Sequence, residues 1–257
     1  MEMPRKPLPT RVAETPALPN EYHDALARGL DALALELSEE ARSAIDGHAR
    51  LLLAWTGSIN LTSIREPAAV ALGHVVDSLT ALSLLRARDV DRFIDLGSGG
   101  GYPGLPLAAA LPAARSLLID PVAKKARFLE AVIGATSLTR IAEAAPLRAE
   151  ALAGDERHRG QWPAVMARAV GGLAELVELA FPLLKPGGLL VAWKRGDLTA
   201  ELAAAERAVS ALGGGHLEVH AVHVPGLDGH RLVVAQAGGR VPPAYPRDPG
   251  LRKRRPW

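Results

Sequence analysis

The sequence predicts an α/β protein in which a mostly parallel, seven-stranded sheet follows a helical extension. Short apolar segments alternate with stretches of helical periodicity over residues 91–240, which is typical of a parallel sheet with helices on both faces. Only the loop PGLDGH separates the last two apolar segments, so they should pair as a hairpin with an antiparallel last strand. The pattern over residues 20–90 is helical.

Three helices are expected in this extension. Leucines recur at spacings of four, three and four from Leu26 to Leu37, which places them on one face of a helix. Ser38 and the two glutamates after it are typical of a helix start, and that helix should run to Trp55. A third helical pattern covers about residues 67–85.

The strands follow from the apolar segments between helical stretches. Pro186-Gly187-Gly188 predicts a turn into the fifth strand. Five prolines without periodicity predict a disordered arm over residues 1–19, and a basic tail is expected at 241–257. The candidate strands are Arg92–Leu96, Ser116–Asp120, Arg140–Glu143, Ala164–Ala167, Leu189–Lys194, Leu217–Val224 and Arg231–Gln236.

Composition excludes several classes of protein. The chain has no cysteine, which rules out a disulfide scaffold, a thiolate metal site and a cysteine nucleophile. The longest apolar runs are short and no signal-peptide pattern occurs, so we expect a cytoplasmic protein without a membrane partner. Nothing in the sequence points to a metal ion or requires more than a monomer.

Charge is placed unevenly along the chain. The net charge is +2, yet the segment from Arg247 to Trp257 carries five basic residues and one acid, a local charge of +4. A basic tail on a nearly neutral body indicates contact with a polyanion such as RNA. The alternative is a solvated end that only aids solubility.

The stretch FIDLGSGGGYPGLPLAAALP, residues 93–112, carries the strongest motif. A Walker phosphate loop is excluded because no Gly-Lys-Ser/Thr occurs. The dinucleotide pattern G-x-G-x-x-G fits Gly99, Gly101 and Gly104, but its register relative to the strand is poor. The pattern D-x-G-x-G-x-G at Asp95, Gly97, Gly99 and Gly101 instead favours adenosylmethionine.

The chemistry of adenosylmethionine accounts for these residue types. Glycines let the backbone pass beside its methionine moiety, and the Asp95 carboxylate can hold its cationic ammonium group. Asp120 ends the second strand, where an acid would accept hydrogen bonds from the ribose hydroxyls, although a dinucleotide would use it in the same way. The alternatives are a helix cap for Asp95 and an ordinary surface acid for Asp120.

The methyl acceptor can be narrowed from what the chain lacks. Attack by C5 of a pyrimidine needs a cysteine, and none is present. Methylation of an exocyclic base amine usually shows Asp/Asn-Pro-Pro-Tyr/Phe after the fourth strand, where this chain has ARAVGG. A lone-pair acceptor such as guanine N7 needs neither device, so no side-chain acid or base is expected to be catalytic. A small-molecule methyltransferase and a non-catalytic dinucleotide- or RNA-binding module remain alternatives.

These motifs together resemble the ribosomal RNA small subunit methyltransferase G family, also called glucose-inhibited division protein B. The stretches that carry the resemblance are INLTSIREP (59–67), HVVDSL (74–79), the glycine stretch, DPVAKKARFL (120–129), RAE (148–150), ARAVGGL (167–173), LLKPGG (183–188) and GHRLVV (229–234). The resemblance implies a Rossmann-like class I methyltransferase that uses S-adenosyl-L-methionine to methylate guanine N7 in the 530 loop of 16S rRNA.

The resemblance also implies roles for single residues. Gly97 and Tyr102 would line the methionine side of the donor, Ala149 and Glu150 would flank its adenine, and Arg168 would close the pocket. A first-turn helix acid and a structural salt bridge are the alternatives for Glu150 and Arg168.

Substrate and RNA contacts are assigned from position in the predicted fold. Asn60, His74, Asp77 and Lys194 are candidates for positioning the substrate, with a helix cap (Asn60, Thr62) and a structural histidine as the alternatives. Basic residues near the expected carboxyl edge of the sheet and in the tail are candidates for phosphate contacts. They are Lys124, Lys125, Arg127, Arg195, Arg231, Arg252, Lys253, Arg254 and Arg255.

Overall fold

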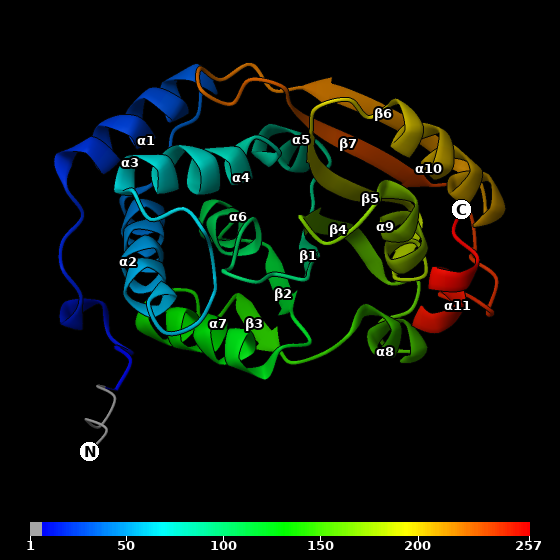
Figure 1. Ribbon diagram of the computed structural model, residues 1–257, viewed down its shortest axis with the longest axis horizontal. Coiled ribbons are helices and arrows are strands. Elements are labelled where there is room, and N and C mark those ends of the chain that lie inside the picture. The colour runs from blue at the N-terminus through cyan, green and yellow to red at the C-terminus, as the bar shows by residue number, and fades with distance from the viewer. Residues whose placement is uncertain (1–6) are drawn as a thin grey trace.

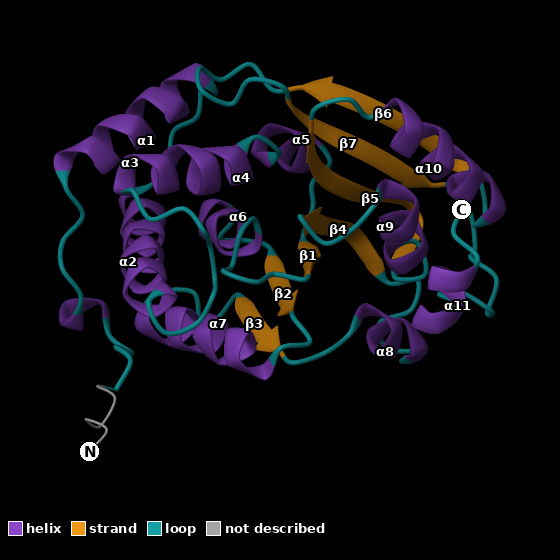
Figure 2. Ribbon diagram, viewed as in Figure 1, coloured by secondary structure: helices purple, strands orange, loops and turns teal. Residues whose placement is uncertain are grey.

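A computed structural model describes residues 7–257 of the chain. Its centre is a seven-stranded sheet in the order β3-β2-β1-β4-β5-β7-β6, with helices against both faces (Figures 1 and 2). Only β7 runs antiparallel to its neighbours, which confirms the predicted mixed sheet and hairpin. The strands are β1 Arg92–Leu96, β2 Arg115–Ile119, β3 Ala142–Ala145, β4 Trp162–Arg168, β5 Leu184–Arg195, β6 Gly215–Ala221 and β7 His230–Ala237.

Side chains of the central strands alternate between two apolar cores, one on each face of the sheet. On β1, Phe93 packs into one core and Ile94 into the other, as the two-residue period of a strand requires. The first core lies under α2, α6 and α7, and the second under α9 and α10. The helices are α1 Asn20–Ala32, α2 Glu39–Thr56, α3 Pro67–Val70, α4 Asp77–Leu79, α5 Leu82–Ala87, α6 Gly104–Ala110, α7 Ala123–Ala135, α8 Ala149–Gly154, α9 Leu173–Ala180, α10 Thr199–Ala211 and α11 Pro249–Arg254.

The strand order reverses between β1 and β4. From β1 the chain moves outward through β2 to β3, and β4 then pairs with the other side of β1. Loops leaving the carboxyl ends of β1 and β4 therefore diverge to opposite faces and leave a crevice between them. This crevice is where an open α/β sheet binds its ligand.

The prediction of a disordered arm is wrong for residues 7–19; residues 1–6 lie outside the described part of the chain. This segment contains a 3₁₀ turn, Val12–Glu14, and packs on α2. The Trp55 indole N–H donates to the Pro9 carbonyl at 2.7 Å, and the Arg50 guanidinium donates to the Thr15 carbonyl at 2.6 Å. Prolines prevent regular structure here, but they do not prevent an extended chain from being anchored by its carbonyls.

The third predicted helix is interrupted. A π-helical segment, Ala71–Val76, separates α3 from α4, and a turn precedes α5. The stretch Pro67–Ala87 is long and apolar enough to meet the test for a membrane span, with a mean hydropathy of 1.6, which the sequence-based prediction had overlooked. However, 56% of its most apolar window is buried inside the fold, as in the core helix of a soluble protein, so this is weak evidence for a membrane span.

Two boundaries also differ from prediction. Pro186-Gly187-Gly188 lies within β5 instead of before it, where the pairing with β4 shifts register. Gly187 has a φ of +79°, which permits the irregularity without strain. The basic tail is folded as well: α11 lies beside α8 and α9 (Figure 1).

Candidate donor and acceptor site

A cavity of about 190 Å³ lies at the carboxyl ends of β1, β2 and β4, in the crevice where the strand order reverses. It brings together residues predicted for the donor from separate parts of the chain. Its lining includes Gly97, Pro121, Ala149, Glu150, Val170 and Arg252. The predicted donor residues at 97, 149 and 150 therefore share one cavity, which they reach from the loop after β1 and from the start of α8.

The loop after β1 has a backbone that only glycine adopts readily. Gly97, Gly99 and Gly101 have φ values of +65°, +55° and +86°. A Cβ on Gly97 would lie 2.7 Å from Val170 Cγ2, and one on Gly101 would lie 2.5 Å from Leu105 Cδ1. The glycines thus serve both the backbone conformation of the loop and its close packing against Val170 and Leu105.

Asp95 lies beneath this loop and is fully buried. Its Oδ2 accepts a hydrogen bond from the Gly104 N–H at 3.0 Å, so it caps the start of α6. Its Oδ1 has no hydrogen-bond partner among residues 7–257. Burial raises the pKa of this carboxyl to about 7, against the lowering effect of its hydrogen bonds. The helix-cap alternative is therefore realised, and the other carboxylate oxygen is buried without a partner.

Asp120 holds the glycine loop from the end of β2. Its Oδ2 accepts from the Gly99 N–H at 3.1 Å, and its Oδ1 accepts from the Val122 N–H at 2.9 Å. Lys125 Nζ lies 3.6 Å from the same carboxylate, which is 3% exposed as a residue. Asp120 thus joins the loops after β1 and β2, and Lys125 neutralises it.

A stack of three rings borders the glycine loop. Tyr102 lies between His48 and His74, with ring centroids 4.3 Å and 4.7 Å away and nearly parallel planes. Burial lowers the pKa of His48 to about 3 and, together with the Arg168 charge, that of His74 to about 4. Both histidines are therefore neutral near pH 7. Arg168 also lies over the Tyr102 ring, 5.5 Å from its centroid.

Arg168, at the carboxyl end of β4, connects the predicted substrate residues. Its guanidinium donates to Asp77 Oδ2 at 2.9 Å and to the Gly73 carbonyl at 3.0 Å, and it lies 3.0 Å from His74 Nδ1. An arginine only donates, so Nδ1 accepts and the Nε2–H of His74 donates to Thr62 Oγ1 at 2.7 Å. Asp77 Oδ1 lies 2.9 Å from His230 Nδ1.

Two substrate-positioning candidates have different surroundings. Lys194 Nζ donates to the Gly171 carbonyl at 2.7 Å and pairs with Glu201 at 2.7 Å, so it holds the loop between β4 and α9. Asn60 is exposed in the loop between α2 and α3. Lys194 is thus fixed by internal contacts, whereas Asn60 is open to solvent.

The predicted RNA contacts divide into exposed and internally paired residues. Arg231 donates to the Gly196 carbonyl, Lys125 pairs with Asp120, and Arg252 pairs with Glu150 and Glu175. The exposed members are Lys124, Arg127, Arg195, Lys253, Arg254 and Arg255.

Sequence reasoning missed several members of the site. His48 gave no signal, because it lies on an apolar helix face 52 positions before the Gly100 carbonyl that its Nε2 contacts at 2.7 Å. His230 was visible within GHRLVV but was not singled out. Trp193, whose indole N–H donates to the Asp77 carbonyl at 2.7 Å, looked like an ordinary strand residue.

Comparison with known proteins decides the family. The profile of the rRNA small subunit methyltransferase G family matches residues 42–231. The chain belongs to this family. It is 34% identical over 238 residues to "Ribosomal RNA small subunit methyltransferase G" of Desulforamulus reducens, covering 92% of this chain and 99% of the relative. It is 39% identical over 237 residues to the protein of the same name in Rubrobacter xylanophilus, covering 91% and 90%.

Membership makes this protein an adenosylmethionine-dependent rRNA methyltransferase, which confirms the predicted cofactor. The fold agrees. A SAM-dependent O-methyltransferase of Thermotoga maritima superposes with a TM-score of 0.53 at 16% identity, covering 74% of this chain and 72% of that one. That similarity supports the predicted Rossmann-like methyltransferase fold and nothing finer.

Proposed function

We propose that this enzyme transfers a methyl group from S-adenosyl-L-methionine to N7 of a guanine in the 530 loop of 16S rRNA, acting in the cytoplasm as a monomer. The observation that carries the proposal is the family match over residues 42–231. The finer assignment of atom and loop rests on the sequence motifs and on the chemistry that the site offers.

The cavity suits the donor. Gly97 lines it without a side chain, at a position where a Cβ would lie 2.7 Å from Val170 Cγ2, and Ala149 and Glu150 reach the same cavity from α8. The unpaired, buried Oδ1 of Asp95 is an acceptor that the ammonium of a methionine moiety would satisfy. Bound there, the donor supplies an electrophilic methyl on a sulfonium.

The acceptor side suits a nucleophilic atom that carries no proton before it attacks. Guanine N7 attacks with its own lone pair, in line with the sulfur–carbon bond, whose electrons return to sulfur, and no proton is released. His74 is neutral, but its Nδ1 faces Arg168 and its Nε2–H faces Thr62, so it is not arranged as a base. The role of these residues is then to orient the guanine and exclude water.

A labelled-methyl assay tests the proposal. Small subunits lacking their modifications and free 16S rRNA are incubated with labelled donor, and the modified base is mapped. Label at a guanine N7 in the 530 loop is expected with the wild type. Gly97→Val, which forces a side chain against Val170, should abolish transfer. Label at another base, or on a small molecule only, would overturn the assigned acceptor.

A further inference from the structure

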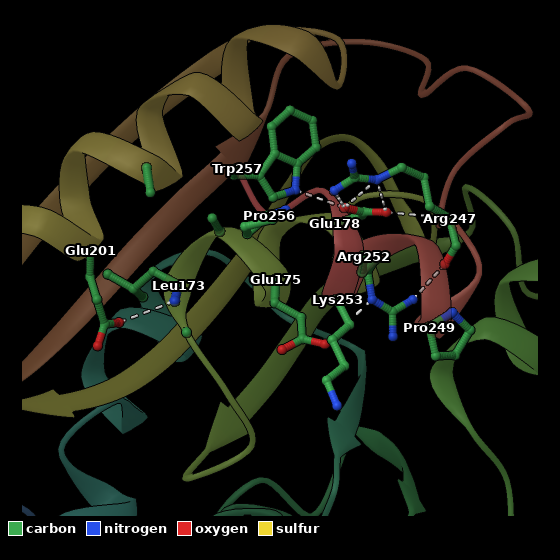
Figure 3. Close-up of a pocket in the computed structure, with 13 residues that line it drawn as sticks. Leu173, Glu175, Glu178, Glu201, Arg247, Pro249, Arg252, Lys253, Pro256 and Trp257 are labelled. Carbon is green, nitrogen blue, oxygen red and sulfur yellow. Dashed lines mark hydrogen bonds and ion pairs between the residues drawn. The ribbon is translucent and has the colours of Figure 1, made fainter.

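The last eleven residues form a strap that is fastened at both ends to one carboxylate. Arg247, where the strap begins, contacts Glu178 through its backbone N–H at 2.8 Å and through its guanidinium, with Nη2 2.6 Å from Oε2. Trp257, the last residue, donates its indole N–H to the same carboxylate at 2.7 Å (Figure 3). Glu178 is fully buried on α9. We call residues 247–257 the C-terminal strap.

The pairing with Glu178 fixes the strap strongly. Burial alone would raise the pKa of Glu178, but hydrogen bonds from Arg247 and Trp257 outweigh it, and the pKa is lowered. Arg247 also donates to the Arg255 carbonyl at 2.9 Å, which closes the strap on itself. The segment is therefore built into the fold.

Arg252 lies midway along the strap and points away from solvent. Its side chain is 9% exposed, and its guanidinium pairs with Glu150 and lies 3.4 Å from Glu175. Its Nη1 donates to the Arg247 carbonyl at 2.6 Å, which ties it to the anchored end. Arg252, Glu150 and Glu175 all line the cavity at the carboxyl ends of β1, β2 and β4.

We propose that the C-terminal strap contributes Arg252 to the wall of the donor pocket and that Arg252 is a positioning residue for Glu150. The Arg252 guanidinium donates to Oε1 of Glu150 and orients the carboxylate, which leaves Oε2 to accept from an amino group such as that of the donor's adenine. This inference rests on the donor site of the proposed function but not on the acceptor.

The strap thus divides its five cations between two tasks. Arg247 pairs with Glu178, and Arg252 pairs with Glu150 and Glu175, all within the protein. Lys253, Arg254 and Arg255 are exposed. The net charge that predicted an RNA grip therefore overstates the number of tail cations available to phosphate.

Donor binding measured by titration calorimetry, without RNA, tests the inference. Arg252→Ala should weaken S-adenosyl-L-methionine binding about tenfold. Arg252→Lys should recover part of the loss, because lysine keeps the positive charge but lacks the several N–H donors of the guanidinium. The matched control is Lys253→Ala/Arg254→Ala/Arg255→Ala, which should leave the donor Kd unchanged. In turnover, Arg252→Ala should raise the KM for the donor and leave kcat nearly unchanged.

A double-mutant cycle distinguishes positioning from general destabilisation. If Arg252 acts through Glu150, adding Arg252→Ala to Glu150→Gln should cost little beyond Glu150→Gln alone. Independent, additive losses would overturn the inference, as would an unchanged donor Kd in Arg252→Ala with weakened RNA binding. If the wild type itself fails to bind the donor, the proposed function fails instead, so the two failures are distinguishable.

Discussion

Two buried carboxylates, Asp95 of β1 and Glu178 of α9, show two ways of keeping an acid inside a protein. Asp95, under the glycine loop, and Glu178, under the C-terminal strap, are both 0% exposed. Asp95 has one backbone N–H on Oδ2 and no partner on Oδ1 within residues 7–257, and its pKa is raised to about 7. Glu178 has a guanidinium and an indole N–H, and its pKa is lowered.

The difference separates a carboxylate that the protein satisfies from one that it leaves short of a partner. Glu178 is satisfied by the protein itself, so its charge is compensated whether or not a ligand is bound. Asp95 is incompletely satisfied, and a cationic ligand would complete it. The donor contact proposed for Asp95 therefore rests on an oxygen that lacks a partner, and not on the presence of an acidic residue as such.

The largest effect is expected from removing the anchor's cation. Arg247→Ala leaves the Glu178 carboxylate buried without a counter-charge, held only by the indole N–H and by the backbone N–H at position 247. Breaking a buried ion pair in this way should lower the free energy of unfolding by about 3 kcal/mol. Urea denaturation measures it. Arg254→Ala, an exposed residue of the same strap, should change stability by less than about 0.5 kcal/mol. Equal effects of the two variants would refute the anchor.

A smaller effect, of opposite sign, is expected at Asp95, where removing the ionisable group should stabilise the folded protein. Its pKa rises from 3.8 in the unfolded chain to about 7 in the folded protein, so the folded state binds more protons between these values. Stability contributed by Asp95 is therefore present at low pH and lost as the pH rises toward 7. Asp95→Asn cannot ionise, and its free energy of unfolding should rise relative to that of the wild type by about 2 to 3 kcal/mol between pH 5 and pH 8.

The two histidines of the ring stack also make stability depend on pH, so the effect of Asp95 is measured as the difference between the wild type and Asp95→Asn. The pKa values of His48 and His74 are lowered to about 3 and about 4, so protonation of the unfolded chain destabilises the protein as the pH falls below about 6.5. That slope opposes the one from Asp95, but it is common to the wild type and Asp95→Asn and cancels between them. If the free energies of unfolding of the two proteins instead run parallel from pH 5 to pH 8, ionisation of Asp95 does not destabilise the folded state and the prediction is wrong.

The sequence predicted what depends on local pattern. The seven strands, the glycine loop and the residues Gly97, Ala149 and Glu150 follow from periodicity, from φ-demanding glycines or from family motifs, and the structure brings those three residues together. The observed strand boundaries differ from the predicted ones where the pairing is irregular, as at Pro186-Gly187-Gly188 in β5.

What failed depends on contacts between distant segments. The pairing of Arg252 with Glu150 joins residues 102 positions apart, and that of Arg247 with Glu178 joins residues 69 positions apart. A count of charges cannot separate a cation that faces an internal carboxylate from one that faces solvent. The same limit hid the order of residues 7–19, whose carbonyls are held by Trp55 and Arg50.

The smallest effects should come from the exposed cations of α7 and of the C-terminal strap, and they compare these two regions as RNA contacts. Lys124 and Arg127 lie on α7, on either side in the sequence of Lys125, which pairs with Asp120 beneath the glycine loop. Lys253, Arg254 and Arg255 lie on the strap. Each phosphate contact that is lost should reduce the slope of log affinity against log salt by about 1. Binding of 16S rRNA by Lys124→Ala/Arg127→Ala and by the triple strap variant should therefore weaken with a shallower slope.

Arg88→Ala is the matched control, because Arg88 is exposed just before the amino end of β1, at the opposite edge of the sheet. It should leave both affinity and slope unchanged. A slope that changes only in the strap variant would place the RNA along α11 alone, and one that changes only in the α7 variant would place it along the glycine loop. A slope unchanged in both would show that phosphate is held elsewhere, with Arg195 as the next exposed cation to remove.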